Sequence, residues 1–368
     1  MTETMPSPTA PTTTVTTTGA PGLPTFLPMP LVPRADAPQS AKDFKTDQEV
    51  RWCPGCGDYV ILAAVQAFMP TLGLRRENIV FVSGIGCSSR FPYYMDTYGM
   101  HSIHGRAPSI ATGLSVTRPD LSVWVVTGDG DALSIGGNHL IHALRRNVNL
   151  KILLFNNRIY GLTKGQYSPT SESGKVTKST PFGSLDTPFN PLSVALGAEA
   201  TFVARSIDSD RKHLTSVLEA AARHEGTALV EIYQNCNIFN DGAFEHLKDP
   251  GTRDAHLLRL EHGQPMTFGD RKVVRGPDGA FRVVALDSPE PAAVHDAHAE
   301  DPTAAFGLSR LQNLETLDPT PVGVFRDVRR PTYDQLMSDQ LEAARAAAGG
   351  GEPDLGRLLA GPDTWVVS

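Results

Sequence analysis

Cysteine is scarce in this sequence, and positive charge is outweighed by negative charge. Four cysteines in 368 residues are too few for the disulfide framework of a small secreted domain. Lysine and arginine number 33 against 40 aspartates and glutamates, a formal net charge of −7. That balance disfavours a nucleic-acid partner. With 40% hydrophobic and 20% charged residues, the composition fits one large globular domain or two smaller ones.

Long apolar runs are missing as well. The best candidate for a membrane span, Tyr59 to Leu74, is interrupted by Gln66 and Pro70 and is too short. The first residues contain no basic segment followed by an apolar one, as a secretory signal would. We therefore expect a cytoplasmic protein with no membrane and no nucleic-acid partner.

The N-terminal segment has little apolar periodicity. Residues 1–40 contain nine prolines and ten threonines, and such a segment cannot bury enough surface to offset its ordering entropy. We predict a disordered Pro/Thr-rich tail over residues 1–43, to which the sequence assigns no role.

Residues 44–245 alternate apolar strands with helices. Strands are predicted at 78–83, 121–127, 150–155, 201–204 and 228–233, and helices at 58–69 with Asp58 as the cap, 134–146, 191–196 and 210–224. Strands that lack a polar face are typical of a parallel sheet covered on both sides by helices. The pattern predicts a doubly wound, mostly parallel α/β sheet.

Polar or thiol groups follow four of these strands. They lie at Gly84 to Cys87, Gly128 to Asp131, Asn156 with Asn157, and Asn235 with Cys236. Ligands of doubly wound sheets bind at the carboxyl ends of the strands. These groups are therefore expected to meet at one edge of the sheet.

The segment from Gly128 to Asn157 has the features of a diphosphate and metal site. Glycines permit close backbone approach to a ligand, and the following helix directs its N-terminus at an anion. Asp129, Asn157 and the carbonyl of Ile159 offer the hard oxygens that Mg²⁺ prefers. Gly-Asp-Gly alone is usually only a turn, but the strand, the helix and the paired asparagines agree with a site. The Rossmann fingerprint G-x-G-x-x-G and the P-loop are both absent.

The four cysteines leave more than one chemistry open. A thioredoxin-like pair would use Cys53 and Cys56 alone, leaving Cys87 and Cys236 as buried thiols. Structural zinc usually takes two closely spaced pairs, whereas a [4Fe–4S] cluster tolerates dispersed ligands. Spacing favours iron–sulfur over zinc only modestly.

Beyond residue 245 the alternation weakens. Residues 272–284 resemble a hairpin turning at Pro-Asp-Gly, residues 288–302 have a linker composition, and a helix is predicted from Tyr333 up to the glycines at 349–351. Residues 246–368 are thus expected to form a C-terminal extension that docks on the core or on a partner, beside a catalytic domain over 44–245.

Taken together, the two motifs resemble one family. The runs WCPGCGD, GIGCSSRFPYYMDTYGMHSIHGRAP, GDGDALSIGGNHLIHALRRN and FNNRIYGLTKGQYSPTS are similar to the β subunits of 2-oxoacid:ferredoxin oxidoreductases. They look most like the members that use 2-oxoglutarate. The resemblance covers roughly residues 44–245 and implies a sheet of the thiamine diphosphate-binding type.

The resemblance also implies a set of site residues. Cys53, Cys56, Cys87 and Cys236 would ligate a [4Fe–4S] cluster, and Asp129, Asn157 and Ile159 would hold Mg²⁺. Residues lining thiamine diphosphate would be Ile85, Gly86, Cys87, Ser88, His104, Gly130, Asp131, Gly161 and Leu162. Lys164 matches a family lysine linked to coenzyme A and is the candidate catalytic residue. Arg90 is a candidate for binding a distal carboxylate.

The implied activity is coenzyme A-dependent oxidative decarboxylation of 2-oxoglutarate to succinyl-CoA and CO₂, with electrons leaving through the cluster to ferredoxin. The implied partner is an α subunit in an α2β2 assembly, which supplies the glutamate for the aminopyrimidine ring of the cofactor. Two alternatives remain: pyruvate or another 2-oxo acid as substrate, or a non-redox thiamine enzyme with structural zinc.

Overall fold

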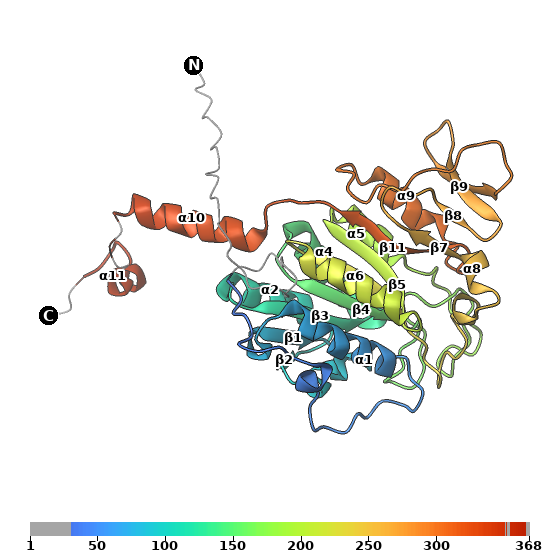
Figure 1. The fold of residues 1–368 in the computed structure, drawn as a ribbon. Helices are drawn as coiled ribbons and strands as arrows, with labels where there is room; N and C mark the ends of the chain where they lie inside the picture. The colour runs from blue at the N-terminus through green and yellow to red at the C-terminus, as the bar shows by residue number, and fades with distance from the viewer. Residues whose placement is uncertain (1–30, 350, 352–353, 366–368) are drawn as a thin grey trace, which may run out of the picture.

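A computed structural model describes residues 31–349, 351 and 354–365 of the chain (Figure 1). Within them, an eight-stranded central sheet has the order β2-β1-β3-β4-β6-β5-β11-β7. Neighbouring strands are parallel except β5 and β11, which are antiparallel. The strands are β1 (Ile79–Ser83), β2 (Tyr98–His101), β3 (Ser122–Gly128), β4 (Lys151–Asn156), β5 (Phe202–Ile207), β6 (Ala228–Tyr233), β7 (Leu257–Leu260) and β11 (Thr320–Asp327).

Helices cover both faces of this sheet. Alternate residues of each strand point to opposite faces, so β3 buries Trp124 and Val126 on one side and Val123 and Val125 on the other. The first side packs against α1 (Asp58–Phe68) and α6 (Arg211–Arg223). The second packs against α2 (Ala107–Thr117), α4 (Gly137–Arg146), α5 (Pro191–Gly197) and α9 (Thr303–Leu311). This is the predicted doubly wound, mostly parallel fold.

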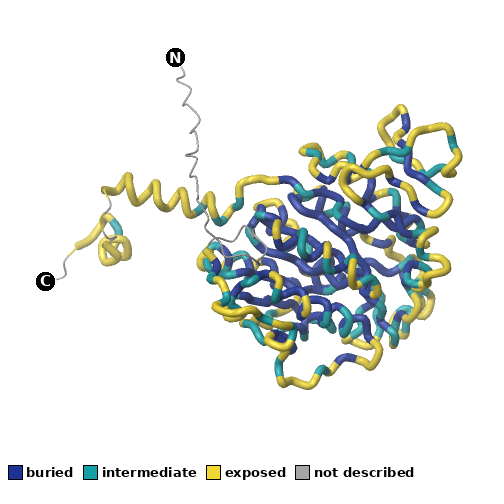
Figure 2. Tube along the Cα trace, in the orientation of Figure 1, coloured by how far each residue is buried: buried dark blue, intermediate teal, exposed yellow. Residues whose placement is uncertain are grey.

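The remaining elements are short or peripheral. A small antiparallel sheet has the order β10-β9-β8, and α10 projects from the body, exposed along most of its length (Figures 1 and 2). No helix among the described residues is long and apolar enough to cross a membrane. The elements are β8 (Thr267–Phe268), β9 (Arg271–Arg275), β10 (Phe281–Ala285), α3 (Asp129–Leu133), α7 (Glu245–Lys248), α8 (Arg253–His256), α10 (Tyr333–Ala347), α11 (Leu355–Ala360), and the 3₁₀ helices η1 (Ala41–Phe44), η2 (Met69–Leu72), η3 (Arg76–Asn78) and η4 (Ser88–Tyr94).

The C-terminal part of the chain is more integrated than an appended extension. The hairpin β9–β10 and helix α10 form as predicted, but β7 and β11 add two strands to the central sheet. The sheet therefore continues past the expected boundary at residue 245. Helix α9, beginning directly after the expected linker, packs against α5 and β11.

Two predictions near the N-terminus need correction. Residues 1–30 lie outside the described part of the chain, but residues 31–43 are placed on the core rather than disordered. Val32 is buried and Arg34 pairs with Leu74. Asp58 does not cap α1 either, because the N-cap is Gly57 and makes no side-chain cap bond.

The helix predicted over residues 134–146 is divided. Its first part, α3, starts already at Asp129, and α4 begins at Gly137. The break lies at Ser134, whose backbone leaves the helical conformation (ψ −110°), and the close approach at the start of α4 requires glycine, since a Cβ on Gly136 would lie 2.4 Å from the carbonyl oxygen of Asp131. The Asp-Gly-Asp part of the motif forms the first turn of α3 instead of a free loop.

Candidate functional site

Four parallel strands, β1, β3, β4 and β6, are consecutive in the sheet, and their carboxyl ends share one edge. The predicted polar and thiol groups follow these strands directly. The sequence prediction that they converge is confirmed by the strand order.

Asp129 is the buried carboxylate of this edge, only 2% exposed. Its Oδ2 accepts hydrogen bonds from the hydroxyls of Ser168 and Thr170, each at 2.6 Å. The same Thr170 hydroxyl oxygen lies 2.9 Å from Oδ1 of Asn156, so it bridges the ends of β3 and β4. Burial raises the pKa of Asp129 above its usual range, and the two hydroxyl bonds oppose that shift. A bound cation would favour the ionised form.

The turn after β4 brings the other two expected Mg²⁺ ligands beside this carboxylate's helix. The side-chain oxygen of Asn157 accepts a bond from the backbone N–H of Ile159 at 3.2 Å. Tyr160 donates its hydroxyl to the carbonyl of Gly130 at 3.0 Å. A Cβ on Gly130 would lie 2.1 Å from the Tyr160 ring, so only glycine permits this contact. One carboxylate, one amide oxygen and one carbonyl are the donor types that Mg²⁺ accepts alongside phosphate oxygens.

Asp131 holds three segments of the edge together. Its Oδ1 accepts the backbone N–H groups of Ile85 at 3.2 Å and Gly105 at 2.8 Å, and lies 3.0 Å from Nδ1 of His104. Its Oδ2 accepts the hydroxyl of Thr127 at 2.7 Å. Asp131 was predicted to line the cofactor. The structure places it one layer deeper, where it positions the backbone of Ile85 and the ring of His104.

The other predicted cofactor-lining residues lie on the same edge. Ser88 is buried at the start of η4, with its hydroxyl 3.6 Å from the Cβ position of Gly128. Ile85, Gly86 and Leu162 line a surface cavity described below.

The four cysteines are free thiols from three separate segments that meet beside this edge. A Cβ built on Gly161 would lie 3.3 Å from Sγ of Cys87 and 3.6 Å from Sγ of Cys236. Burial, together with nearby Asp58, Cys236 and Cys53, raises the pKa of Cys87 to about 12. Burial and Asp58 likewise raise the pKa of Cys56 far above its usual range. Thiols gathered in this way need a positive centre to become ligands.

The arrangement of the thiols is not that of a closed single-metal site. Within the described residues, no three histidine, cysteine, aspartate or glutamate side chains gather closely enough to hold one metal ion. A four-iron cluster would bind each cysteine to a different iron and so tolerates ligands farther apart than those of one zinc ion.

Backbone and indole bonds fix the cysteine loops. The N–H of Gly57 donates to the carbonyl of Asn235 at 3.1 Å, and the side chain of Asn237 donates to the carbonyl of Pro54 at 2.7 Å. The indole of Trp52 donates to the carbonyl of Cys87 at 2.7 Å. The three segments are thus tied together by the protein itself.

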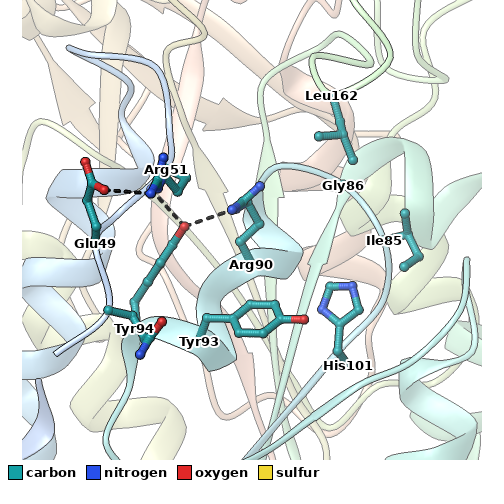
Figure 3. A pocket seen from close by; sticks show the side chains of 10 residues that line it. Glu49, Arg51, Ile85, Gly86, Arg90, Tyr93, Tyr94, His101 and Leu162 are labelled. Atoms are coloured by element: carbon teal, nitrogen blue, oxygen red, sulfur yellow. Dashed lines mark hydrogen bonds and ion pairs between the residues drawn. The ribbon is translucent and has the colours of Figure 1, made fainter. Parts of the chain in front are cut away.

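A cavity of about 490 Å³ opens beside Ile85 and Gly86 (Figure 3). In Figure 3, the hydroxyl of Tyr94 lies between Arg51 and Arg90, accepting from Nε of Arg90 at 3.0 Å and from the backbone of Arg51 at 2.9 Å. Arg51 also pairs with Glu49 at 2.8 Å. The lining residues are Gln48, Glu49, Arg51, Ile85, Gly86, Arg90, Tyr93, Tyr94, His101 and Leu162. Two guanidinium groups and a histidine make this cavity suited to an anion.

The turn of residues 161–165 separates this cavity from a second one. Leu162 lines the first cavity, and Lys164 lines the second, also of about 490 Å³, with Lys178, Ile238 and Phe239. Gly161, between them, faces two cysteine sulfurs. Lys164 therefore lines the second cavity and not the first.

Sequence reasoning missed several polar residues that shape the site. Ser168 and Thr170 lie in the long segment between β4 and α5. They stand at the end of the quoted run of residues 155–171, but no role was assigned to them. Gln234, whose side chain reaches Cys56 at 3.2 Å, was adjacent to the recognised Asn235–Cys236 pair and could have been found from its place at the end of β6.

Comparison with known proteins agrees with this geometry. Residues 84–232 match the family model described as "Thiamine pyrophosphate enzyme, C-terminal TPP binding domain". The chain is 64% identical over 340 residues to the 2-oxoglutarate oxidoreductase subunit KorB of Mycobacterium tuberculosis, covering 91% of each chain. It is 44% identical over 292 residues to the 2-oxoacid:ferredoxin oxidoreductase subunit beta of Saccharolobus solfataricus, covering 78% of this chain and 86% of that one.

A solved structure is similar over most of the fold. The 2-oxoglutarate:ferredoxin oxidoreductase from Magnetococcus marinus, with 2-oxoglutarate, coenzyme A and succinyl-CoA bound, matches with a TM-score of 0.70 and 35% identity, covering 89% of this chain and 97% of that chain. The thiamine-type sheet edge, the family model and relatives that match along nearly the whole chain agree with one another. The chain belongs to the family of β subunits of 2-oxoacid:ferredoxin oxidoreductases.

Proposed function

We propose that this β subunit catalyses, with its α subunit, the coenzyme A-dependent oxidative decarboxylation of 2-oxoglutarate and passes the electrons through a [4Fe–4S] cluster to ferredoxin. The observation that carries the proposal is the turn of residues 161–165. Two cysteine sulfurs lie against Gly161, an anion-binding cavity lies beside Leu162, and a lysine-lined cavity lies beside Lys164. Substrate, electron acceptor and acyl acceptor would thus occupy neighbouring positions.

The diphosphate half of the site is proposed to hold thiamine diphosphate through Mg²⁺. Bound thiamine diphosphate supplies the electron sink for decarboxylation. Asp129, Asn157 and the Ile159 carbonyl would ligate the metal, while Ser168 and Thr170 orient the carboxylate through its Oδ2. The first turn of α3 directs backbone N–H groups toward the diphosphate.

The four cysteines are proposed to hold the cluster. The bound cluster supplies a one-electron acceptor. Cys56, Cys87 and Cys236 are bare thiols with raised pKa values, and the positive iron centre would stabilise their thiolates. Because Gly161 has no side chain, the sulfurs of Cys87 and Cys236 can lie close to its backbone.

The first cavity is proposed to bind the 2-oxo acid. Arg51 and Arg90 offer guanidinium groups in one cavity, and a dicarboxylate such as 2-oxoglutarate carries the second anionic group that pyruvate lacks. The relative from Magnetococcus marinus has 2-oxoglutarate, coenzyme A and succinyl-CoA bound, which supports the same assignment. Lys164 and Lys178 would attract the phosphates of coenzyme A in the second cavity.

The α subunit is proposed to complete the site, in an α2β2 assembly located in the cytoplasm. In the family it supplies the glutamate that acts on the aminopyrimidine ring, so this chain alone should not turn over a 2-oxo acid. The experiment is co-expression with a candidate α subunit, followed by assays with 2-oxoglutarate, pyruvate and a branched 2-oxo acid, using coenzyme A and ferredoxin or a viologen dye.

Three results decide the proposal. Reduction of the acceptor with 2-oxoglutarate, dependent on both subunits and on coenzyme A, supports it. Robust turnover by the single chain would contradict the proposal that both subunits form the active site. A preference for pyruvate would contradict 2-oxoglutarate as the substrate. Metal analysis of anaerobically purified complex separates the remaining alternative, because stoichiometric zinc without iron and sulfide would indicate a non-redox thiamine enzyme.

A further inference from the structure

A buried glutamine touches one of the predicted cluster ligands. Gln234, at the end of β6, is 1% exposed. Its side-chain nitrogen lies 3.2 Å from Sγ of Cys56 and 2.6 Å from the carbonyl oxygen of Asn235. Its backbone N–H donates to the carbonyl of Asn156 at 3.0 Å, so the residue is anchored from both ends.

The orientation of the Gln234 amide follows from its neighbours. A side-chain amide has one donor end and one acceptor end. Both groups at its inner end, the Cys56 sulfur and the Asn235 carbonyl, accept hydrogen bonds once the cysteine is a ligand. Turning the amide over would set its oxygen against two acceptors. The NH₂ group therefore faces the sulfur, and the oxygen Oε1 is buried without a hydrogen-bond partner among the described residues.

That unpartnered oxygen indicates that Gln234 does not serve stability. A buried polar atom without a partner costs about 1–3 kcal/mol. An apolar side chain of similar size would avoid the cost while filling the same space. The NH₂ group of Gln234 donates to the Asn235 carbonyl and to the Cys56 sulfur, and the second of these bonds reaches a predicted cluster ligand.

We propose that Gln234 is a positioning residue that donates an N–H···S hydrogen bond to Cys56 and thereby raises the reduction potential of the cluster. The inference rests on the cluster assigned under the proposed function. Hydrogen bonds to ligand sulfurs stabilise the more electron-rich, reduced state and are a principal determinant of cluster potential. The bond is buried, and a low-dielectric environment strengthens it.

A second polar group lies close to Cys56 in the chain. Asp58 is fully buried, and neither of its carboxyl oxygens has a hydrogen-bond partner by geometric criteria among the described residues. The Gln234 amide is the side-chain donor that the described residues place on Cys56. Its removal should therefore change the reduction potential of the cluster.

The test is a redox titration of the αβ complex carrying Gln234→Leu, followed by EPR of the reduced cluster. Leucine keeps the volume and removes the donor. We expect iron and sulfide content to match the wild type and the reduction equilibrium to shift roughly tenfold toward the oxidised state, which for one electron is about 59 mV. The matched control is Gln312→Leu, another buried glutamine, whose amide bonds Tyr233 and Thr320 instead of a sulfur. Its potential should stay at the wild-type value.

A second measurement covers the case in which Gln234→Leu does not assemble. Wild-type complex labelled with side-chain-¹⁵N glutamine should show a ¹⁵N coupling to the reduced cluster in pulsed EPR. An unchanged potential in Gln234→Leu, or no ¹⁵N coupling in the wild type, overturns the role of Gln234 while leaving the cluster in place. Wild-type complex without iron and sulfide would instead overturn the proposed function.

Discussion

Replacing Asp131 by alanine should loosen two loops of the cofactor edge at once. The carboxylate accepts the N–H groups of Ile85 and Gly105 and the hydroxyl of Thr127, and it lies within hydrogen-bond distance of His104. Alanine removes every acceptor, and the N–H of Gly105 becomes a buried donor with no partner. Asparagine keeps one oxygen for the two backbone donors, but it removes the charge and replaces the acceptor of the Thr127 hydroxyl by an NH₂ group.

The structure sets the size of the effect. A hydrogen bond to a charged group contributes about 1.5–3 kcal/mol, but His104 is half exposed and its share is small. We expect Asp131→Ala to lower the free energy of unfolding by roughly 3–5 kcal/mol and Asp131→Asn by about 1 kcal/mol. Thiamine diphosphate binding should weaken in the same order, because the cofactor must then order both loops itself.

The assay is urea unfolding followed by tryptophan fluorescence, together with titration of the αβ complex with thiamine diphosphate and Mg²⁺. The matched control is Asp120→Ala, which breaks an exposed ion pair with Arg118 at 2.7 Å. Such pairs contribute about 1 kcal/mol or less. If Asp131→Ala were no more destabilising than Asp120→Ala and bound the cofactor as tightly as the wild type, the positioning role of Asp131 would be refuted.

Three further changes test other parts of the molecule. Thr170→Val removes a hydroxyl that orients Asp129 and should weaken Mg²⁺-dependent cofactor binding roughly 10–100-fold; unchanged Mg²⁺ titration would contradict the metal site. Lys164→Ala should raise the KM for coenzyme A severalfold without changing the KM for the 2-oxo acid. If the KM for coenzyme A equalled that of the wild type, Lys164 would be a solvated lysine with no role in binding. Burial, with Arg259 nearby, lowers the pKa of His213 from 6.5 to about 4. Between these pH values the folded state binds fewer protons than the unfolded state, so the free energy of unfolding falls as the pH drops from about 6.5 to 4. His213→Gln should remove up to about 3 kcal/mol of that loss, as measured by urea unfolding at pH 7 and pH 4.5; identical pH dependence in both proteins would show that His213 is not buried as described.

The strands of the sheet could be predicted where consecutive residues are mostly apolar. β1, β3, β4, β5 and β6 are mostly apolar and buried on both faces, although β5 and β6 also bury Arg205 and Glu231 as an ion pair. The rule for parallel sheets then places the polar carboxyl ends of β1, β3, β4 and β6 together. β11 escaped prediction because it contains proline, glycine and two charges. Its Arg326 is buried only because its guanidinium donates to the carbonyls of Ala200 and Glu300. Such a strand depends on distant partners that the local sequence does not reveal.

The candidate site divides in the same way. Asp129, Cys87 and Cys236 could be predicted to meet because each follows a strand, whereas Cys53 and Cys56 precede α1 and were added to the set by the family resemblance. Ser168 and Thr170 were not predicted, because a polar loop gives no indication of which hydroxyl turns inward. Asp131 was assigned to the right place for an incomplete reason, since its contacts are with the loops that would hold the cofactor.

The turn of residues 161–165 explains why these groups belong to one site. Gly161 cannot acquire a side chain without pressing on two sulfurs, while its neighbours Leu162 and Lys164 line separate cavities. The backbone of this turn is fixed from the cofactor side, because Tyr160 bonds the carbonyl of Gly130 and pairs with Gln166. Any displacement of the diphosphate turn would therefore be transmitted to the sulfurs and to both cavities. Under the proposed function, this single short segment would couple the cofactor site to the cluster and to the cavity proposed for coenzyme A.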